Sequence, residues 1–147
     1  MQLNWRLKAF TELSNYELYE ILKLRSKVFV VEQNCVFQDM DDKDTKCLHL
    51  MGFADNALVA YSRLVPSGVS YKEVSIGRVV TDPDYRAKGL GKELMQLSIE
   101  KIEEAFGKHP IRIGAQLYLK DFYESFGFNI NSAEYIEDGI PHIEMLR

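Results

Sequence analysis

The chain has 147 residues, of which 46% are hydrophobic and 27% are charged, and its formal net charge is −4 at pH 7. This length and composition are typical of one globular domain with a sizeable core, so we expect a single domain over residues 1–147. The negative balance disfavours nonspecific nucleic-acid binding. No apolar run reaches the length of a signal peptide or a membrane span, so we expect a cytoplasmic protein without a membrane partner.

The cysteine and acidic patterns predict no metal site. Cys35 and Cys47 lie twelve residues apart, without a second cysteine pair or a histidine cluster at zinc-binding spacing. We interpret both as small buried apolar residues. In the acidic run Asp39–Asp44, Lys43 and the missing glycine break the ligand pattern of a calcium hand. The run is either a solvated connection or a rim that attracts a cationic amine.

The chain begins with a strand pattern followed by a helix pattern. Alternating apolar residues predict a strand at Asn4–Phe10. The capping-box sequence Ser14-Asn15-Tyr16-Glu17 then opens a helix whose apolar residues continue to Phe29. Arg25 falls near the end of this helix, where a positive charge is favoured.

Three strands are predicted next. Cys47–Phe53 and Leu58–Val65 flank Asp55-Asn56, a pair that suits a hairpin turn. After a loop, Val74–Val80 forms the third strand. Gly77 inside it indicates a bulge or the close approach of a ligand or another backbone.

The second half of the chain is dominated by a long helix. Its apolar residues recur at helical spacing from Leu90 to Phe106, and Gly107–Pro110 ends it. The remaining elements are predicted as a strand at Ile111–Gln116, a helix at Leu119–Phe126, and two strands, Phe128–Tyr135 and His142–Leu146, joined by a turn at Asp138–Pro141. This order predicts a mixed α/β domain around a sheet covered on both faces.

The turn Arg86-Ala87-Lys88-Gly89-Leu90-Gly91 leads from the third strand into the long helix. Amides at a helix start lack intrahelical acceptors and the helix dipole is positive there, so an anion fits. Gly89 and Gly91 let the backbone approach that anion, and Arg86, Lys88 and Lys92 add positive charge. The predicted ligand is a phosphate or a pyrophosphate.

Two common phosphate loops do not match this turn. The third glycine of the Rossmann fingerprint would fall at Leu94, and two positions of the Walker loop are occupied by Arg86 and Glu93. The Arg-x-x-Gly-x-Gly pattern that remains resembles the acetyl-coenzyme A loop of the GNAT N-acetyltransferase superfamily. The alternative is a basic surface turn that happens to contain glycines.

Other segments extend the resemblance over most of the chain. Phe122–Phe128 resembles the superfamily's Tyr-x-x-x-Gly-Phe segment. Phe29–Cys35, Ile76–Val79 and Asp138–Ile143 are similar to the bacterial ElaA-type branch. The resemblance implies one GNAT acetyltransferase domain of the α/β (α+β) class. Its mixed, mostly antiparallel central sheet would have about six to seven strands flanked by about four helices.

The implied activity is transfer of the acetyl group of acetyl-coenzyme A to a primary amine, by direct attack within a ternary complex. Acetyl-coenzyme A would be the cosubstrate, no metal would take part, and the acceptor would be a small molecule or a peptide amine. A homodimer is compatible with the resemblance. The alternatives are a protein acetyltransferase acting on lysine or an N-terminus, and a coenzyme A-binding module without turnover. The Arg25-x-x-Val28-Phe29 sequence also suggests a homoserine-lactone synthase, against which the glycine turn argues.

The resemblance also implies how the cofactor is held. Amides of the turn would bind the pyrophosphate, and backbone groups of the preceding strand would bind the pantetheine arm and stabilise the oxyanion. The cofactor-binding residues carried over in this way are Val79, Val80, Arg86, Ala87, Lys88, Gly89, Leu90, Gly91, Lys92 and Tyr123.

The catalytic residues carried over are an acid and an undecided base. Tyr123 would protonate the departing thiolate; the alternative is a packed tyrosine whose hydroxyl bonds to the backbone. Glu73, near the start of the third strand, and His142 are the candidate bases. His142 could instead bond a neighbouring loop, and Glu32 or a relayed water could replace either base.

Four residues are candidates for binding the acceptor: Arg25, Glu32, Arg78 and His142. Arg25 and Arg78 would clamp a carboxylate or phosphate if they point into the pocket, or they would pair with Glu32 or the acidic run. The acidic run suggests a cationic acceptor and the arginines an anionic group. An amino acid, an amino-sugar phosphate or a polypeptide end would satisfy both.

Overall fold

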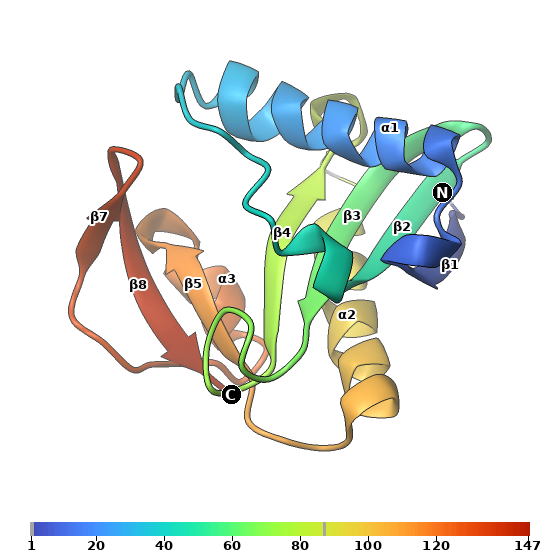
Figure 1. The fold of residues 1–147 in the computed structure, drawn as a ribbon. Coiled ribbons are helices and arrows are strands. Elements are labelled where there is room, and N and C mark those ends of the chain that lie inside the picture. Colours follow the sequence, from blue (N-terminus) through green and yellow to red (C-terminus); the bar gives the residue numbers. More distant parts are fainter. Residues whose placement is uncertain (1, 87) are drawn as a thin grey trace.

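The computed structural model describes residues 2–86 and 88–147, and Figure 1 shows its fold. The strands are β1 (Asn4–Ala9), β2 (Leu48–Ala54), β3 (Ala57–Val65), β4 (Ser75–Thr81), β5 (Arg112–Gln116), β6 (Asn129–Ile130), β7 (Tyr135–Glu137) and β8 (Ile140–Leu146). The α-helices are α1 (Asn15–Arg25), α2 (Leu90–Phe106) and α3 (Lys120–Glu124).

The strands form two sheets that meet at one point. The first sheet has the order β1-β2-β3-β4, and in the second β5 pairs with β8, which also pairs with β6 and β7. Between the sheets the structure has one isolated parallel bridge, Val74 to Ile111, where Arg112 N–H donates to Val74 O at 3.0 Å. Beyond this bridge β4 and β5 diverge, as Figure 1 shows.

Helix α1 lies on one face of the first sheet and α2 on the other (Figure 1). The residues that pack α1 and the π-helical segment after it onto the sheet are Ile21, Leu24, Val28, Met51, Phe53 and Tyr61. Those that pack the start of α2 are Leu90, Leu94, Leu3, Leu50, Val59 and Ala60. Leu50 and Met51 are neighbours in β2 and therefore face opposite sides, so the sheet is covered on both.

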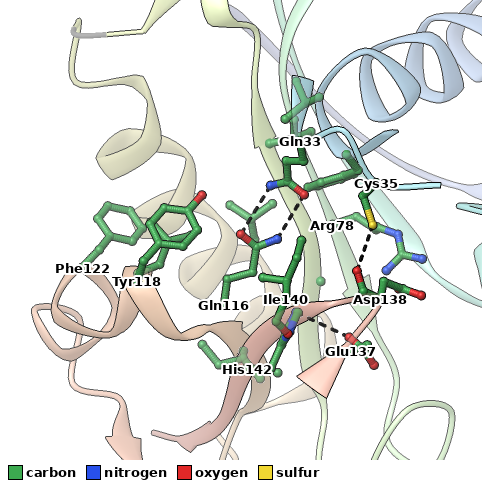
Figure 2. Close-up of a pocket in the computed structure, with 18 of the residues that line it drawn as sticks. Gln33, Cys35, Arg78, Gln116, Tyr118, Phe122, Glu137, Asp138, Ile140 and His142 are labelled. Carbon is green, nitrogen blue, oxygen red and sulfur yellow. Dashed lines mark hydrogen bonds and ion pairs between the residues drawn. The ribbon is translucent and has the colours of Figure 1, made fainter. Parts of the chain in front are cut away.

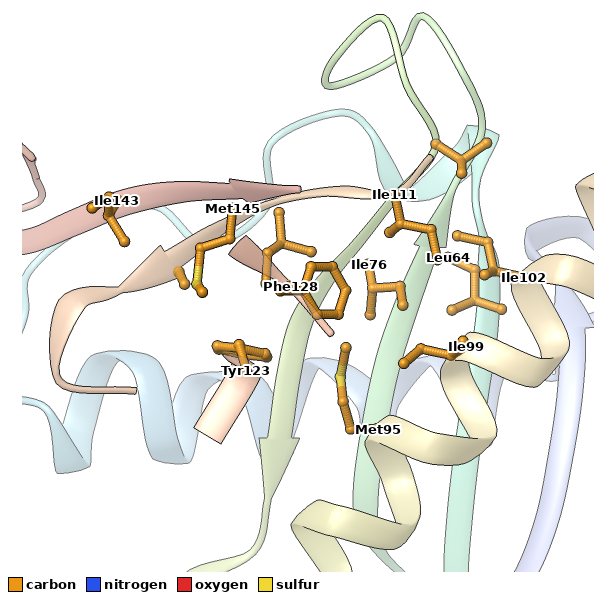
Figure 3. Close-up of a cluster of buried hydrophobic side chains, with 13 residues drawn as sticks. Leu64, Ile76, Met95, Ile99, Ile102, Ile111, Tyr123, Phe128, Ile143 and Met145 are labelled. Carbon is orange, nitrogen blue, oxygen red and sulfur yellow. The ribbon is translucent and has the colours of Figure 1, made fainter. Parts of the chain in front are cut away.

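Helix α2 also joins the two sheets through a shared core (Figure 3). Its residues Met95, Ile99 and Ile102 are buried in one cluster with Ile113 and Met145 of the second sheet, Tyr123 of α3, and Phe128 between α3 and β6. The two sheets are therefore fixed relative to each other through α2, although they share only one backbone bridge.

The structure confirms the predicted mixed α/β fold and corrects its details. The sheet is divided into two four-stranded sheets because β4 and β5 share a single bridge. The first α-helix ends at Arg25, where a π-helical segment, Ser26–Glu32, continues it. Its predicted capping box is present, with Glu17 N–H donating to Ser14 Oγ at 3.0 Å.

The predicted strand at Phe128–Tyr135 is wrong, because the chain there forms the short strands β6 and β7. Between them the hydroxyl of Ser132 accepts the N–H of Glu144 at 2.9 Å, in place of a strand carbonyl. The following turn is also shorter than predicted. Asp138 and Gly139 alone form it, with φ of 51° and 76°, which suits a two-residue hairpin.

Candidate active site

The divergence of β4 from β5 opens a cavity of about 640 Å³ between the two sheets. Val79 and Val80 of β4 line one wall, and Ile113 and Gln116 of β5 line the other. β4 pairs with β3 along one edge, and past Val74 its other edge has no strand partner in the described part of the chain. Backbone groups on that edge are therefore available to a ligand.

A bulge in β4 shapes this wall. Tyr61 pairs with Val80 but Arg63 pairs with Gly77, so β4 carries one residue more than β3 between the two pairs. Arg78 adopts a positive φ of 49°, a conformation that costs a non-glycine residue about 1–2 kcal/mol. The sequence located the bulge at Gly77, whereas the left-handed residue is its neighbour.

The side chain of Arg78 holds the bulge. Its Nε donates to Asp39 Oδ1 at 2.8 Å, and its Nη2 donates to the Asp39 carbonyl oxygen at 2.8 Å. Asp39 also accepts from Arg25 Nε at 2.7 Å. The strained residue of β4 is thus tied to the loop before β2 and, through it, to the end of α1.

We use the name arginine–aspartate cluster for Arg25, Arg63, Arg78, Asp39, Asp41 and Asp44. Arg25 donates to Asp44 Oδ1 at 2.8 Å as well as to Asp39, and Arg63 donates to Asp41 and Asp44 at 2.8 and 2.9 Å. Burial favours the protonated acid at Asp41, but hydrogen bonds from Arg63 outweigh it and hold the pKa of Asp41 well below its usual value. The pKa of Asp44 is lowered in the same way.

The cluster changes two expectations for the acceptor site. Arg25 is completely buried and does not line the cavity, so a substrate clamp by Arg25 is corrected to a structural ion pair. Asp39, Asp41 and Asp44 are paired with guanidinium groups, so apart from the exposed Asp42 the acidic run is not a free rim. Arg78 does line the cavity, with two of its three nitrogens directed at the cluster.

The start of α2 opens to one end of the cavity. Gly89, the N-cap of α2, has φ of 74° and supplies no side-chain cap. Gly91 lines the cavity, and the nearest atom to a Cβ built there is on Phe122 at 3.9 Å. The first turn of α2 thus has no side-chain cap and the space beside Gly91 is uncrowded, which leaves room for a bound pyrophosphate. Ala87, also expected to bind it, lies outside the described residues.

Glu32 and Arg86 form an ion pair on the cavity wall. Arg86 Nη1 and Nη2 donate to the two carboxylate oxygens of Glu32 at 2.7 and 2.8 Å, and Nη2 also donates to Thr81 O at 3.1 Å. Lys88 and Lys92 are exposed nearby. Arg86, the first residue of the turn, thus has its charge balanced by Glu32. Glu32 is one of the residues expected to bind the acceptor.

Tyr123 projects from α3 into the cavity with only 7% of its surface exposed. Its ring packs edge-on against Phe122 and Phe128, at centroid distances of 5.2 and 6.1 Å. Its hydroxyl has no hydrogen bond to the described residues, so the alternative of a backbone-bonded tyrosine is not observed. Burial raises the pKa of Tyr123 to about 12, with a smaller effect from Tyr118, so the hydroxyl keeps its proton at neutral pH.

His142 reaches the cavity from β8 and is oriented by the hairpin before it. Its Nδ1 lies 2.7 Å from Ile140 O, which can only accept a hydrogen bond, so Nδ1 carries a proton. In the neutral imidazole Nε2 then presents a lone pair, 3.6 Å from Glu137 Oε2. Tyr135 stacks on the ring at a centroid distance of 5.7 Å.

The structure brings Tyr123 and His142 to the same cavity but leaves Glu73 outside it. Glu73 pairs with Arg112, whose Nε and Nη2 donate to its carboxylate at 3.1 and 3.2 Å. We therefore correct the expectation that Glu73 could act as the base. Glu73 precedes β4 and is next to Val74, whose bridge to Ile111 is the point from which β4 and β5 diverge. Glu73 therefore lies where the two strands are still close together, away from the cavity between them.

Other cavity residues were not singled out from the sequence (Figure 2). Gln33 and Gln116 exchange amide hydrogen bonds of 3.3 Å across the cavity, and Cys35 Sγ donates to Asp138 O at 3.1 Å. Glu137 faces His142. Gln33 and Cys35 fall in a segment that carried the family resemblance, but no local pattern indicated their partners.

Two negative findings apply to residues 2–86 and 88–147. No group of three or more histidine, cysteine, aspartate or glutamate side chains is placed to hold a metal ion. None of the helices there combines the length and the apolar character needed to cross a bilayer.

Comparison with known proteins gives the family. Escherichia coli ElaA is 41% identical over 147 residues, covering 99% of this chain and 96% of its own. The crystal structure of ElaA superposes with a TM-score of 0.93. An acyl-CoA N-acyltransferase from Pseudomonas aeruginosa superposes with a TM-score of 0.95 at 39% identity, covering 99% of both chains. Residues 13–147 match the acetyltransferase (GNAT) domain, and the chain belongs to that family.

Proposed function

We propose that the protein transfers the acetyl group of acetyl-coenzyme A to a primary amine of a small molecule, by direct attack within a ternary complex. The observation that carries this proposal is the cavity between β4 and β5, which has the uncapped start of α2 at one end and Tyr123 and His142 along its length. The acyl-CoA N-acyltransferase from Pseudomonas aeruginosa, which has the same fold and similar sequence, supports it.

The residues of the cavity fit the cosubstrate. The amides of Leu90, Gly91 and Lys92 would accept the pyrophosphate, and Lys88 is exposed beside them. Backbone groups on the unpaired edge of β4 at Val79 and Val80 would hydrogen-bond the pantetheine arm. The arm would then occupy the place of an additional strand beside β4. A backbone N–H on this edge could also stabilise negative charge on the thioester oxygen, a contribution typically worth about 3–4 kcal/mol.

Tyr123 and His142 provide the proton transfers that the reaction needs. His142 Nε2 takes one proton from the acceptor ammonium, which frees the nitrogen lone pair. The C–N bond then forms as the C–S bond breaks. The Tyr123 hydroxyl protonates the departing thiolate sulfur, and the second proton of the amine nitrogen restores the tyrosine. The products are an amide, coenzyme A and one proton held by His142.

The first test is acetyl-coenzyme A binding to the Gly91→Asp variant, measured by calorimetry. A Cβ at Gly91 meets only ordinary contact with Phe122, so we expect the variant to fold. The added carboxylate faces the expected pyrophosphate position, so affinity should fall by about 100-fold or more. The control, Gln96→Asp, adds the same charge at an exposed position of α2 and should bind normally. Equal affinities for both variants would reject the assignment of the turn.

Turnover distinguishes the proposal from its alternatives. A coenzyme A-binding module would bind the cosubstrate without releasing thiol in the presence of any amine. A protein acetyltransferase would release thiol with peptide amines and not with small ones. The cytoplasmic location and the homodimer expected from the sequence remain predictions.

A further inference from the structure

The cavity continues past Glu137 and Asp138 into a second hollow of about 600 Å³. Seven residues line both: Phe37, Ile76, Gly77, Arg78, Gly114, Glu137 and Asp138. Figure 2 places Glu137 and Asp138 on the other side of the cavity from Phe122, which lies beside Gly91. If the cosubstrate enters at the α2 end, the acceptor must approach from the shared end.

The positive charges at the shared end are already neutralised. Arg78 is paired with Asp39, and Arg63, which lines the second hollow, is paired with Asp41 and Asp44. An anionic group on the acceptor would have to compete with these buried carboxylates for the guanidinium groups. Such competition is unfavourable because a displaced carboxylate would remain buried without a partner.

The negative charges at this end are not neutralised in the same way. The carboxylate of Glu137 has no arginine or lysine partner among the described ion pairs, and its side chain is 61% exposed. By contrast, Glu144 in the second hollow is paired with Arg112 at 3.0 Å. Lys43 also lines the second hollow but is not among the residues shared with the cavity.

Glu137 and His142 present two hydrogen-bond acceptors to one point. When the imidazole is neutral, Nδ1 donates to Ile140 O, so Nε2 and Glu137 Oε2 are two acceptors that face each other across 3.6 Å; in the protonated ring the same two atoms form an ion pair. The His142 side chain is only 9% exposed, and within the described residues Nε2 has no hydrogen bond. A ligand with several N–H donors, such as an ammonium group, would satisfy both atoms.

We propose that the acceptor is a primary amine that binds as its ammonium ion between Glu137 and His142 and carries no anionic group. This inference rests on the proposed acetyl transfer and names the substrate class of the same site. Glu137 selects the positive charge, and His142 Nε2 then removes the proton. Amino acids and amino-sugar phosphates should be poorer substrates, because the arginines at this end, Arg78 and Arg63, already have carboxylate partners.

The test compares three acceptors of equal carbon-chain length, 1,6-diaminohexane, hexylamine and 6-aminohexanoate. Their kcat/KM values are measured by thiol release at saturating acetyl-coenzyme A. We expect both cationic amines to be acetylated and 6-aminohexanoate to be at least about tenfold poorer than hexylamine. A preference for 6-aminohexanoate, or acetyl-coenzyme A binding without acetylation of either cationic amine, would overturn the inference. Loss of acetyl-coenzyme A binding itself would instead reject the proposed function.

A matched pair of variants tests the role of Glu137. Glu137→Gln removes the charge and should raise KM for 1,6-diaminohexane about tenfold without altering acetyl-coenzyme A affinity. Glu134→Gln makes the same change three residues away at an exposed position that lines neither cavity, and its KM should be unchanged. Equal KM values for Glu137→Gln and the unmodified protein would show that the carboxylate does not bind the amine.

Discussion

The arginine–aspartate cluster and the cavity beside it are both polar, but they satisfy their polar groups in opposite ways. In the cluster each guanidinium has a carboxylate partner within 2.9 Å, and among the described residues Arg63 Nε is the one cluster atom that is buried without a hydrogen bond. In the cavity the Tyr123 hydroxyl and His142 Nε2 have no hydrogen-bond partner in the described residues, and the first turn of α2 has no side-chain cap. Such groups are costly unless a ligand or water completes them, so the cluster supports the fold and the cavity supports binding.

The two regions meet at Arg78. Its backbone bends the cavity wall at β4, and its side chain belongs to the cluster. The positive φ of this residue is unfavourable by itself, so the bulge depends on contacts that fix it. The cluster therefore positions the edge of β4 that would bind the cosubstrate, without touching the reacting atoms.

The largest loss of stability is expected when Arg25, at the buried centre of the cluster, is replaced. Arg25→Met keeps the volume of the side chain but leaves Asp39 and Asp44 short of a cation. We expect the free energy of unfolding to fall by about 3–5 kcal/mol, measured by urea titration. Lys23→Met on the exposed side of α1 is the control and should change it by less than about 0.5 kcal/mol. Similar values for both variants would mean that the cluster is not structural.

Tyr123→Phe in the cavity should lower activity and leave stability unchanged, whereas Arg25→Met lowers stability. The hydroxyl makes no described internal bond, so its removal should leave stability and acetyl-coenzyme A affinity nearly unchanged while kcat falls about 100-fold. Because burial raises the pKa of Tyr123 to about 12, the hydroxyl stays protonated as pH rises through the neutral range. The tyrosine should therefore produce no loss of rate below pH of about 11.

The exposed Tyr16 supplies the control for this variant. Tyr16→Phe lies on α1, where the side chain is outside the cavity, and kcat should not change. If Tyr123→Phe also retains full kcat, Tyr123 serves only to pack against Phe122 and Phe128. If it loses stability instead, the hydroxyl has a structural role and the contrast with the cluster is lost.

The parts of the molecule that could be predicted from the sequence depend on residues close together in the chain. The capping box at Ser14, the hairpin turn at Asp55-Asn56 and the glycine turn before α2 each have a local cause. In these places a few neighbouring side chains determine the backbone. Tyr123 was predicted in another way, from the family resemblance, and the structure brings it to the cavity.

The cluster could not be predicted because its pairs are distant in sequence. Arg25 meets Asp44 nineteen residues away, and Arg78 meets Asp39 thirty-nine residues away. Sequence inspection singled out Arg25, Arg78 and an acidic run but not which charges were in contact, so it left open whether the two arginines bind a substrate. The break between β6 and β7 similarly depends on Ser132 contacting Glu144, twelve residues on.

The smallest effect is expected from the one amide pair that crosses the cavity. Gln33 and Gln116 exchange hydrogen bonds of 3.3 Å, longer than the shortest ion pair of each cluster arginine and partly open to solvent. Gln116→Met should therefore lower the free energy of unfolding by less than about 1 kcal/mol in the same urea titration. A loss comparable to that of Arg25→Met would show that the cavity walls are held together as firmly as the cluster. The cavity would then be a structural joint between the sheets, and the division between a supporting region and a binding region would fail.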